Sequence, residues 1–555
     1  MNRAERRRQQ KLADKTASRS PLQRSLTSPQ TLSLALQHHS AGRLSEAESL
    51  YRQLLQADPN QPDALHFLGV IACQFGKNDI AVDLINKAIA IKPDYADAHS
   101  NLGNALKGLG KLDQALTSYH KAIAINPDHA DAHSNLGSAL KGLGKLDEAV
   151  ASYRKALAIN PDLADAHYNL GNTLKELGML DEAVASYNKV LAVKPDYVDA
   201  HTNLGNALKD LGKLNEAVAS YHKALAIKPN LADAHFNLGN ALKGLGKLEQ
   251  AVTSYHKAIA IKPDHADAHS NLGSALRELG KLDEAVTSYR KAIAINPDFA
   301  GAYSNLGSAL KELGKRDEAV ASYHKAITIN PGLHSAQHIL NSMLGTTTDS
   351  APIDYVKDLF DGYADHFEHK LLNDLSYSMP SLLKDIFLES GLVEGKLSRA
   401  IDLGCGTGLL GDQFKSLVEV LVGIDLSANM IVKAEEKNIY DELYVDELVE
   451  GLDALSAKFD LFLASDVFVY VGNLSPIFES IERHAQKDAL LLFSTEHTNG
   501  EGFILQDTGR YAHTKDYVFG AAEKFGFQLE HFSTTDLRKD KNIWITGGIY
   551  MFRCG

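Results

Sequence analysis

A glycine-rich segment at residues 400–411 carries the residues whose types and spacing best support ligand-binding chemistry. It reads Ala-Ile-Asp-Leu-Gly-Cys-Gly-Thr-Gly-Leu-Leu-Gly, an apolar run that ends at Asp402 and then breaks into alternating glycines. Gly404, Gly406 and Gly408 allow the backbone to turn sharply and to approach a ligand closely. A helix after such a loop offers its N-terminal amides to the same ligand. The segment therefore predicts a strand followed by a loop that binds a phosphate or a nucleoside.

A second acid stands at the end of the next apolar run. Residues 420–424 are apolar and are followed by Asp425. An acid at such a strand end can accept hydrogen bonds from both ribose hydroxyls, a requirement that adenine dinucleotides share with S-adenosylmethionine. Gly406, Gly408 and Gly411 also fit the G-x-G-x-x-G spacing of dinucleotide-binding loops, so glycine spacing alone leaves both ligands open.

Asp402 favours one of these ligands, because it precedes the glycines in the order D-x-G-x-G-x-G. This order resembles motif I of the class I S-adenosylmethionine-dependent methyltransferases. The resemblance implies that Asp402 and the three glycines hold the methionine end of S-adenosylmethionine. It also implies methyl transfer as the activity.

Other cofactor-binding positions follow from the predicted strand ends. Leu426 and Met430 would flank the adenine. Residues 443–448 resemble motif III, in which an acid meets the adenine amino group; Glu447 is the preferred acid and Asp446 the alternative. Leu448 and Ser465 complete this predicted set.

An aromatic segment precedes the glycine loop. Residues 360–367, Phe-Asp-Gly-Tyr-Ala-Asp-His-Phe, resemble the helix before motif I in small-substrate methyltransferases, where a tyrosine can close over the cofactor. Tyr363 is the candidate, and ordinary packing is the alternative.

The fourth predicted strand, residues 459–465, is followed by Asp466, at a strand end that faces the reacting methyl group in the resembled family. Methyltransferases of planar nitrogens carry Asn-Pro-Pro-Tyr or a variant here, whereas this chain has Ser-Asp-Val-Phe. The departure removes the best argument for a nucleobase or glutamine acceptor. Asp466 is therefore a catalytic candidate without an assigned acceptor.

Further catalytic candidates lie in residues 509–517, which are predicted to form a loop at the carboxyl end of the sheet, where substrates bind in such folds. The candidates are Arg510, Tyr511 and His513. His513 is a hypothetical general base for a hydroxyl or thiol, since histidine titrates near neutral pH; a structural histidine is the alternative.

Strands alternating with helical segments predict an α/β doubly wound, Rossmann-like domain over residues 353–555. Later strands are expected at residues 488–495, 527–532 and 544–553. The last two would form a terminal antiparallel hairpin, which the methyltransferase family has and dinucleotide-binding domains lack.

The first half of the chain is periodic. A proline recurs every 34 residues from Pro59 to Pro331, and each unit contains two amphipathic helical patterns, as in residues 98–109 and 112–125. Such helix pairs bury their apolar faces only by stacking, so the sequence predicts an α-solenoid.

The repeat unit resembles the tetratricopeptide repeat, on Leu102, Gly103, Ala115, Tyr119 and Pro127. Nine units are expected over residues 28–333, followed by a capping helix at 334–344 and a linker at 345–352. Together with residues 360–367 and 509–517, the repeats resemble the predicted bacterial methyltransferases that carry tetratricopeptide repeats, for which an architecture but no substrate is implied.

One asparagine recurs in the first helix of seven consecutive units. A carboxamide donates and accepts hydrogen bonds, so a ladder of them could bind the backbone of an extended peptide. The ladder resembles that of O-linked N-acetylglucosamine transferases, and hydrogen bonds between repeats are the alternative. Its members are Asn101, Asn135, Asn169, Asn203, Asn237, Asn271 and Asn305.

Six histidines recur in the same way, each two residues after an aspartate such as Asp97: His99, His133, His167, His201, His235 and His269. Metal binding is not expected, because residues i and i+2 do not face each other on a helix. Half-exposed packing residues are predicted instead, and no metal site is expected in the chain.

Composition excludes several classes of protein. Three widely spaced cysteines give no disulfide framework, and residues 1–27 carry eight basic against two acidic side chains without a signal-like apolar run. No run of about 18 apolar residues indicates a membrane span, so a cytoplasmic protein with a basic, disordered leader is expected. From residue 346 onward, 35 acidic side chains face 18 basic ones, which disfavours nucleic acid as a partner.

These patterns together predict an S-adenosylmethionine-dependent methyltransferase whose solenoid recruits a protein or an extended peptide. The acceptor could be a small molecule or a protein. The alternative is a non-catalytic scaffold with a vestigial cofactor domain. A glycosyltransferase is excluded, because about 200 residues after the linker cannot hold the two nucleotide-binding domains that such a catalytic half requires.

Overall fold

The computed structural model describes residues 27–362, 364, 367–540 and 543–555. The chain separates into two compact units, Met1–Pro263 and Asp264–Gly555. The leader before Thr27 and the candidate Tyr363 lie outside the described residues. Within the described part of the chain, no helix is both long enough and apolar enough to span a membrane.

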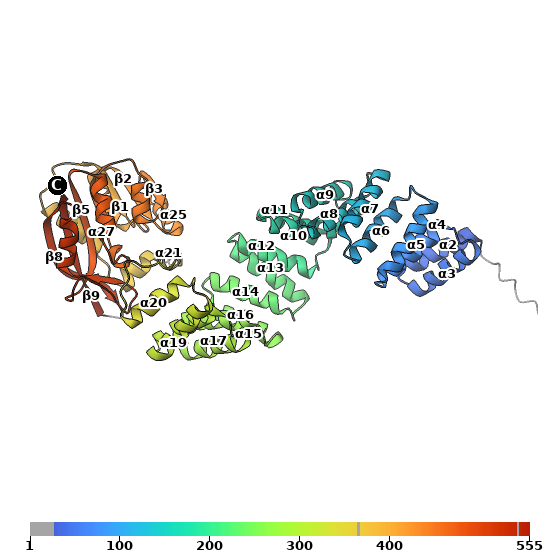
Figure 1. Cartoon of the computed structure of the whole chain (residues 1–555), viewed down its shortest axis with the longest axis horizontal. Coiled ribbons are helices and arrows are strands. Elements are labelled where there is room, and N and C mark those ends of the chain that lie inside the picture. Colours follow the sequence, from blue (N-terminus) through green and yellow to red (C-terminus); the bar gives the residue numbers. More distant parts are fainter. Residues whose placement is uncertain (1–26, 363, 365–366, 541–542) are drawn as a thin grey trace, which may run out of the picture. The chain divides into compact units, whose positions relative to one another are not determined.

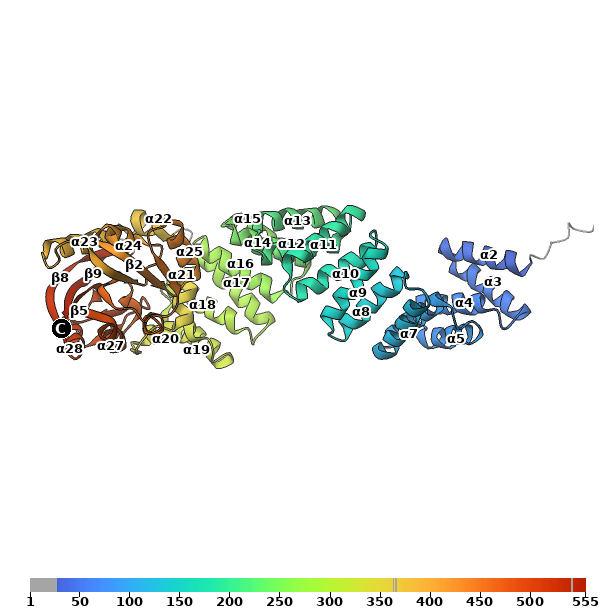
Figure 2. The same ribbon diagram turned by 90° about the horizontal axis from the view of Figure 1, so that it is seen from above.

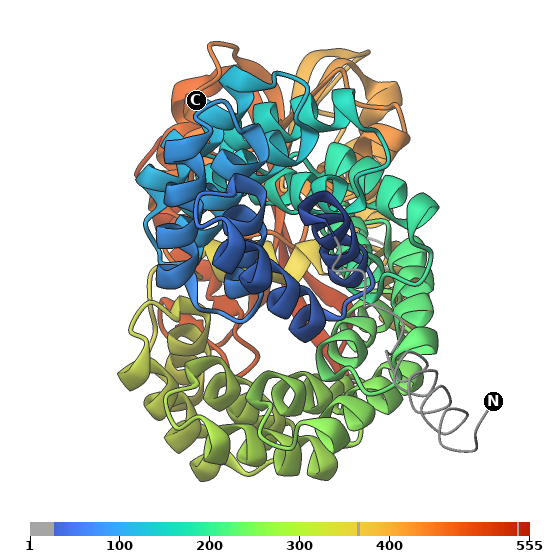
Figure 3. The ribbon, with the colours of Figure 1, turned by 90° about the vertical axis from the view of Figure 1, so that its right-hand side faces the viewer.

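Paired antiparallel helices build the first unit (Figure 1). Consecutive pairs stack in chain order, as the blue-to-green helices of Figure 3 show. The pairs are α2 (Ser28–Ser40) and α3 (Leu44–Ala57), α4 (Pro62–Gln74) and α5 (Asn78–Ile91), α6 (Ala96–Gly108) and α7 (Leu112–Ile125), α8 (Ala130–Gly142) and α9 (Leu146–Ile159), α10 (Ala164–Glu176) and α11 (Leu180–Val193), α12 (Val198–Asp210) and α13 (Leu214–Ile227), α14 (Ala232–Gly244) and α15 (Leu248–Ile261).

The second unit begins with two more helix pairs and a single closing helix. These are α16 (Ala266–Glu278) and α17 (Leu282–Ile295), α18 (Ala300–Glu312) and α19 (Arg316–Ile329), and then α20 (His334–Leu344). The predicted α-solenoid of helix pairs is therefore confirmed.

In the seven helix pairs from α6 and α7 to α18 and α19, a glycine of the first helix packs against a tyrosine of the second. In the pair of α12 and α13, Tyr221 is fully buried, and a Cβ atom added to Gly205 would lie 2.6 Å from its ring. The glycine is thus required because the ring lies against its backbone. The same relation holds between Gly103 and Tyr119 in the pair of α6 and α7.

We expect Gly205→Ala to destabilise the repeats by about 1–3 kcal/mol, the usual cost of forcing one carbon into a packed core. The measurement is the urea midpoint followed by circular dichroism. Gly142→Ala is the matched control, because its added Cβ meets only the end of the Leu112 side chain, at 3.2 Å. An equal midpoint for both variants would contradict this account of the packing.

The repeated histidines have a structural role in the described chain. Through Nε2, His99 donates a hydrogen bond to the carbonyl of Pro93 at 2.9 Å, and His133 donates to the carbonyl of Pro127 at 3.0 Å. The same bond recurs at His167, His201 and His235. These rings are mostly buried rather than half-exposed as predicted, and they fix the turn that precedes each first helix.

Several ladder asparagines bond to the preceding repeat. The Asn203 amide donates to Asn172 at 2.9 Å and to the Tyr168 hydroxyl at 3.1 Å, and the Asn237 amide donates to Asn206 at 3.1 Å. Asn101 lies 2.9 Å from His66 of the preceding pair. The amide N–H groups of Asn203 and Asn237 therefore serve inter-repeat packing, which was the alternative interpretation of the ladder. Peptide binding by the ladder stays a prediction.

The second unit continues as an α/β domain built on one nine-stranded sheet. Its strands are β1 (Leu397–Leu403), β2 (Val418–Asp425), β3 (Glu442–Val445), β4 (Phe459–Ala464), β5 (Ala485–His497), β6 (Phe503–Leu505), β7 (Tyr511–His513), β8 (Phe527–Asp540) and β9 (Ile543–Cys554). Its helical segments are α21 (Ile353–Asp361), α22 (Phe367–His369), η2 (Lys370–Asp374), α23 (Met379–Glu389), α24 (Leu409–Phe414), η3 (Lys415–Leu417), α25 (Ala428–Glu436), α26 (Leu448–Asp453), η4 (Phe468–Tyr470), α27 (Ser475–His484) and α28 (Lys515–Glu523).

The strand order β3-β2-β1-β4-β5 is parallel, and it reverses direction along the chain after β3. Strand β9 pairs antiparallel with both β5 and β8. The predicted doubly wound sheet with a terminal antiparallel hairpin is therefore confirmed. Such a sheet places its binding crevice at the carboxyl ends of β1 and β4, where the strand order changes direction.

Helices cover both faces of this sheet. Helices α23 and α24 lie on one side and α27 and α28 on the other (Figure 2). Phe387 and Phe414 pack with Leu421 on the first side, whereas Phe478 and Val518 belong to the core on the second side. The strands are buried on both faces, which explains their nearly continuous apolar sequences.

One part of the predicted topology is wrong, and one predicted strand is longer than expected. Residues 511–513, expected in a loop, form β7, which pairs parallel with β5 and antiparallel with β6. Strand β8, expected over residues 527–532, continues to Asp540. Backbone pairing overrides the polar composition of both segments, because β5 and β9 supply long edges to pair with.

The last repeats are joined to the α/β domain within the second unit. Arg316 of α19 binds the Asp507 carboxylate at 2.9 Å, and Lys311 donates to the Asp507 carbonyl at 2.7 Å. Buried His338 of α20 donates through Nε2 to the Gly509 carbonyl at 2.9 Å. In the segment after α20, the Asp349 carbonyl accepts bonds from the amides of residues 472 and 473 at 2.8 and 2.7 Å.

Candidate functional site

A cavity of about 350 Å³ lies at the carboxyl ends of β1, β2 and β4. The glycine loop forms part of its wall, and apolar side chains of α21 and η4, among them Val356, Phe360 and Val469, face it. Six predicted cofactor residues with side chains line it: Asp402, Asp425, Leu426, Glu447, Leu448 and Ser465. Two predicted glycines, Gly404 and Gly406, also line it.

The glycine loop requires its glycines. Gly404 has φ +71°, and a Cβ atom there would lie 2.5 Å from Val467. Its amide donates to the Ile424 carbonyl at 2.8 Å, which ties the loop to the end of β2. Gly408, with φ +88°, is the residue that precedes α24. The loop thus turns from β1 into α24 in a conformation that favours glycine.

Asp402 is buried at the end of β1 and accepts a hydrogen bond from the Tyr440 hydroxyl at 2.7 Å. Burial raises the pKa of Asp402 to about 7, against the lowering effect of the Tyr440 bond. A buried carboxylate at a cavity wall is costly unless a cation or donors face it. Asp402 is therefore suited to a ligand that brings positive charge or N–H groups.

Asp425 fixes the loop from the neighbouring strand. One carboxylate oxygen accepts from the Gly406 amide and the other from the Ser427 amide, both at 2.8 Å. Burial raises the pKa of Asp425, and these two bonds oppose the rise. The carboxylate thus holds the glycine loop while it lines the cavity.

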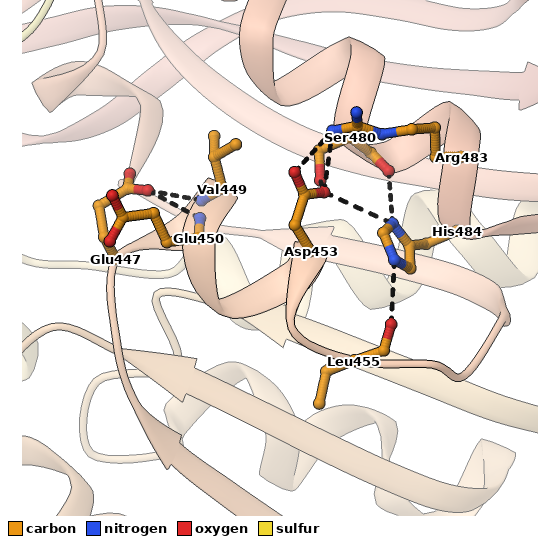
Figure 4. Close-up of polar contacts among 8 residues, drawn as sticks. All are labelled: Glu447, Val449, Glu450, Asp453, Leu455, Ser480, Arg483 and His484. Atoms are coloured by element: carbon orange, nitrogen blue, oxygen red, sulfur yellow. Dashed lines mark hydrogen bonds and ion pairs between the residues drawn. The ribbon is translucent and has the colours of Figure 1, made fainter.

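Glu447 lies at the start of α26, where its carboxylate accepts from the amides of Val449 at 2.7 Å and Glu450 at 3.1 Å (Figure 4). At the other end of α26, Asp453 binds Ser480 and Arg483 of α27. Both ends of this short helix are therefore fixed, and Glu447 caps it while lining the cavity. The alternative acid, Asp446, does not belong to the cavity wall.

Met430 is placed differently from its prediction. It is fully buried in α25 and does not line the cavity, so it is a packing residue rather than a wall of the site. Leu426 lines the cavity as expected, and Ser465 does so while its hydroxyl lies 2.6 Å from that of Tyr377.

Charged side chains gather at one end of the cavity. Asp466 follows β4 with φ +61°, and both of its carboxylate oxygens accept bonds from Arg538 of β8. Arg538 also binds Glu496 at the end of β5, and both side chains are only 2% exposed. Arg510 lies 3.8 Å from Glu496 and lines the cavity with Asp466 and Arg538.

Sequence reasoning missed Arg538 and Glu496. Glu496 could have been found, because it is an acid near the carboxyl end of a predicted parallel strand, as Asp425 is. Arg538 gave no such signal, since it lies in the polar stretch Ser-Thr-Thr-Asp-Leu-Arg-Lys-Asp. Only the pairing of β8 with β9 carries it to the site.

The structure does not bring two catalytic candidates to the cavity. Tyr511 is buried in β7, and its hydroxyl lies 2.6 Å from that of Thr348. His513 is also fully buried, and its Nε2 donates to the Gly472 carbonyl at 3.0 Å. Burial lowers the pKa of His513 to about 4. The hypothesis of a general base at His513 is therefore corrected to a packed strand residue, because β7 turns its ring into the core.

Within residues 27–362, 364, 367–540 and 543–555, no cluster of three or more His, Cys, Asp or Glu side chains is arranged to hold a metal ion. The described site thus consists of a glycine loop, buried carboxylates and an arginine-containing charge cluster around one cavity.

Family models match both halves of the chain. A model described as "Methyltransferase domain" matches residues 401–493. Models described as "TPR repeat" and "Tetratricopeptide repeat" match segments from residue 38 to residue 333.

Curated relatives match the α/β domain at low identity. The malonyl-[acyl-carrier protein] O-methyltransferase of Bacillus cereus is 27% identical over 124 residues, which cover 22% of this chain and 44% of that protein. The ubiquinone biosynthesis O-methyltransferase of Glaesserella parasuis serovar 5 is 27% identical over 142 residues, which cover 24% and 58%. The chain thus spans about half the length of these relatives.

Solved structures match the repeats. YrrB, described as a TPR protein with an unusual peptide-binding site, is 29% identical, with coverage of 33% of this chain and 95% of that chain and a TM-score of 0.31. MamA is 33% identical, with coverage of 29% and 95% and a TM-score of 0.29.

Proposed function

Because the chain is a tetratricopeptide repeat protein that carries a methyltransferase domain, we propose that it transfers a methyl group from S-adenosylmethionine to an acceptor oxygen. The observation that carries this proposal is the pair of buried acids, Asp402 and Asp425, beside one glycine loop at one cavity. The curated relatives support oxygen as the acceptor atom, since both are O-methyltransferases.

The donor set of the cavity fits S-adenosylmethionine. Asp402 offers a carboxylate to the ammonium group of the methionine part, and Asp425 offers one to the ribose hydroxyls. A Cβ atom on Gly406 would meet only Phe367, at 3.7 Å, so this glycine leaves the space beside the loop open to a ligand. Leu426 and Leu448 supply apolar surface for an adenine ring.

When bound, S-adenosylmethionine would supply an electrophilic methyl group on its sulfonium, for in-line transfer to the acceptor with the thioether as leaving group. The chain's own residues bind and align the reactants, which is where proteins gain rate in such reactions. The apolar residues Val356, Phe360 and Val469 exclude water from the cavity. Asp466 and its bonded Arg538 hold fixed charges beside the predicted methyl position.

The solenoid is proposed to recruit a protein, as substrate or as anchor. Repeats of this kind suggest protein or peptide binding. The carbonyl oxygens of Asn203 and Asn237 would serve as acceptors for a peptide backbone, because their N–H groups already bond to the preceding repeat. The alternative is a scaffold in which the cofactor cavity has lost its activity.

The test supplies methyl-labelled S-adenosylmethionine to the full-length protein in a cell extract and separates acid-precipitable from soluble label. Label above the level of an Asp402→Ala control is expected. Label in protein would identify recruited proteins as acceptors, and label in small molecules would make the solenoid an anchor. No label from a protein that still binds the cofactor would contradict catalysis and favour the scaffold.

A further inference from the structure

The guanidinium of Arg510 lines the cavity with more N–H donors than its neighbours accept. Its side chain is 27% exposed and lines the cavity, and its ion pair with Glu496 is 3.8 Å long, beyond hydrogen-bond distance. Tyr470 is a second neighbour of the guanidinium. Five N–H donors in a planar fork exceed what these two described partners can accept. The cavity therefore contains a cation with donors left for a ligand.

The other charged side chains at this end of the cavity already bind one another. Arg538 binds both oxygens of Asp466 and also binds Glu496. Glu496 is thus closer to Arg538 than to Arg510. Among the described side chains of this cluster, Arg510 is the one whose charge is least well matched. The two arginines balance the two carboxylates in formal charge, and an anion from outside the chain would bind to the N–H groups of Arg510 that these partners leave available.

The backbone around Arg510 holds it in place. The Arg510 carbonyl accepts from the Gln506 amide at 2.8 Å, and the Arg510 amide donates to the Thr508 hydroxyl at 3.3 Å. On either side, the Gly509 carbonyl accepts from His338, and Tyr511 is buried in β7. Such a fixed arginine binds a planar anion through two parallel hydrogen bonds.

We propose that the methyl acceptor is a carboxylate, which Arg510 binds and directs toward the methyl donor. This inference rests on the proposed function and names its acceptor. A carboxylate oxygen forms the new O–CH3 bond as the S–CH3 bond breaks, and the electron pair of that bond stays on the sulfur. The products are a methyl ester and a thioether. No proton leaves the acceptor, so the reaction requires no general base, in agreement with the burial of His513 in β7.

The chemical lability of the product tests this inference. Methyl esters release methanol in base, whereas methyl ethers and methylated thiols or amines do not. The full-length protein is incubated with S-adenosyl-[methyl-³H]methionine and a cell extract freed of its own S-adenosylmethionine. The products are then treated with base, and volatile tritium is counted. We expect most of the transferred label to become volatile.

Three variants connect this result to Arg510. Arg510→Gln is expected to lose at least about tenfold of the base-volatile label, because one charge-assisted bidentate pair is removed, and Arg510→Lys is expected to be intermediate. Arg553→Gln is the matched control, since Arg553 pairs with Glu530 away from the cavity. Binding of S-adenosylhomocysteine, measured by calorimetry, is expected to stay unchanged in all three.

Four outcomes would overturn the inference. Base-stable label would show another acceptor, and full base-volatile label from Arg510→Gln would show that the arginine is not needed. Weaker S-adenosylhomocysteine binding by Arg510→Gln would assign the arginine to the cofactor instead. No label in any fraction would overturn the proposed methyltransferase activity itself, and with it the carboxylate acceptor.

Discussion

Replacing Asp425 by alanine is expected to weaken binding of S-adenosylhomocysteine by about 100-fold or more. Two kinds of contact are lost together. The ribose hydroxyls lose their proposed acceptor, and the Gly406 and Ser427 amides lose the carboxylate that fixes the glycine loop. Hydrogen bonds to a charged group contribute roughly 1.5–3 kcal/mol each, and 1.4 kcal/mol corresponds to tenfold in affinity. Calorimetric titration of the full-length protein measures the change.

Glu419→Ala is the matched control, because Glu419 is an exposed acid near the start of the same strand, β2. It is expected to bind S-adenosylhomocysteine like the parent protein. Far-ultraviolet circular dichroism should show unchanged helix content in both variants, since neither touches the repeats. Unweakened binding by Asp425→Ala would remove Asp425 from the cofactor site.

Replacing Arg538 by methionine is expected to destabilise the α/β domain by about 3–5 kcal/mol. Arg538 is buried and bonds to both Asp466 and Glu496, so its loss leaves Asp466 without the cation that it binds and leaves Glu496 with only the more distant Arg510. Removing one partner of a buried ion pair has a cost of this size, because the remaining charge keeps its desolvation penalty. Exposed pairs contribute only about 0–1 kcal/mol, so Arg553→Met, which breaks the pair with Glu530, is the control.

The single tryptophan of the chain allows unfolding of the α/β domain to be measured separately from unfolding of the repeats. Trp544 lies on β9 opposite Lys539 of β8, one pair away from Arg538 and Ile545. Its fluorescence follows the unfolding of the hairpin in urea, whereas circular dichroism at 222 nm is dominated by the repeats. A fluorescence midpoint equal to that of Arg553→Met would contradict the proposed role of Arg538.

The loss of stability caused by Arg538→Met is expected to depend on pH. Burial raises the pKa of Glu496 above its usual 4.5, and Arg538 and Arg510 oppose that rise. When the pKa of an acid is higher in the folded state, the free energy of unfolding falls as the pH rises above the pKa that the acid has in the unfolded chain. Without Arg538, the pKa of Glu496 is expected to rise further. The deficit should therefore be greatest at pH 8 and smaller at pH 5.5, where Glu496 is more often protonated.

The sequence predicted the helix pairs and the central strands closely. The apolar pattern at residues 112–125 coincides with α7 (Leu112–Ile125), and the run at 420–424 lies within β2 (Val418–Asp425). In both cases one face or both faces of the element are buried against a neighbour, so the residue types follow a simple period. The glycine loop could be predicted from the sequence for a related reason, because its turn requires glycines at fixed places.

The residues at the acceptor side of the cavity were harder to predict from the sequence. His513 and Tyr511 were assigned to a loop because the segment is polar, whereas β7 buries both side chains through pairing with β5. Arg538 was missed because its environment is made by residues far away in sequence, Asp466 and Glu496. Residue type and spacing report local conformation, but they do not report which distant charge a buried arginine meets.

The join between the last repeats and the α/β domain bears on how such a protein can evolve by recombination. Near-identical repeats can be duplicated or lost without changing their neighbours, since each contacts mainly the next. The last repeat is different, because Arg316, which binds Asp507, stands where the six preceding repeats have leucine. The portion of the chain that can be transplanted onto another repeat array is therefore the α/β domain together with α18–α20, and the array can vary in length only on the N-terminal side of them.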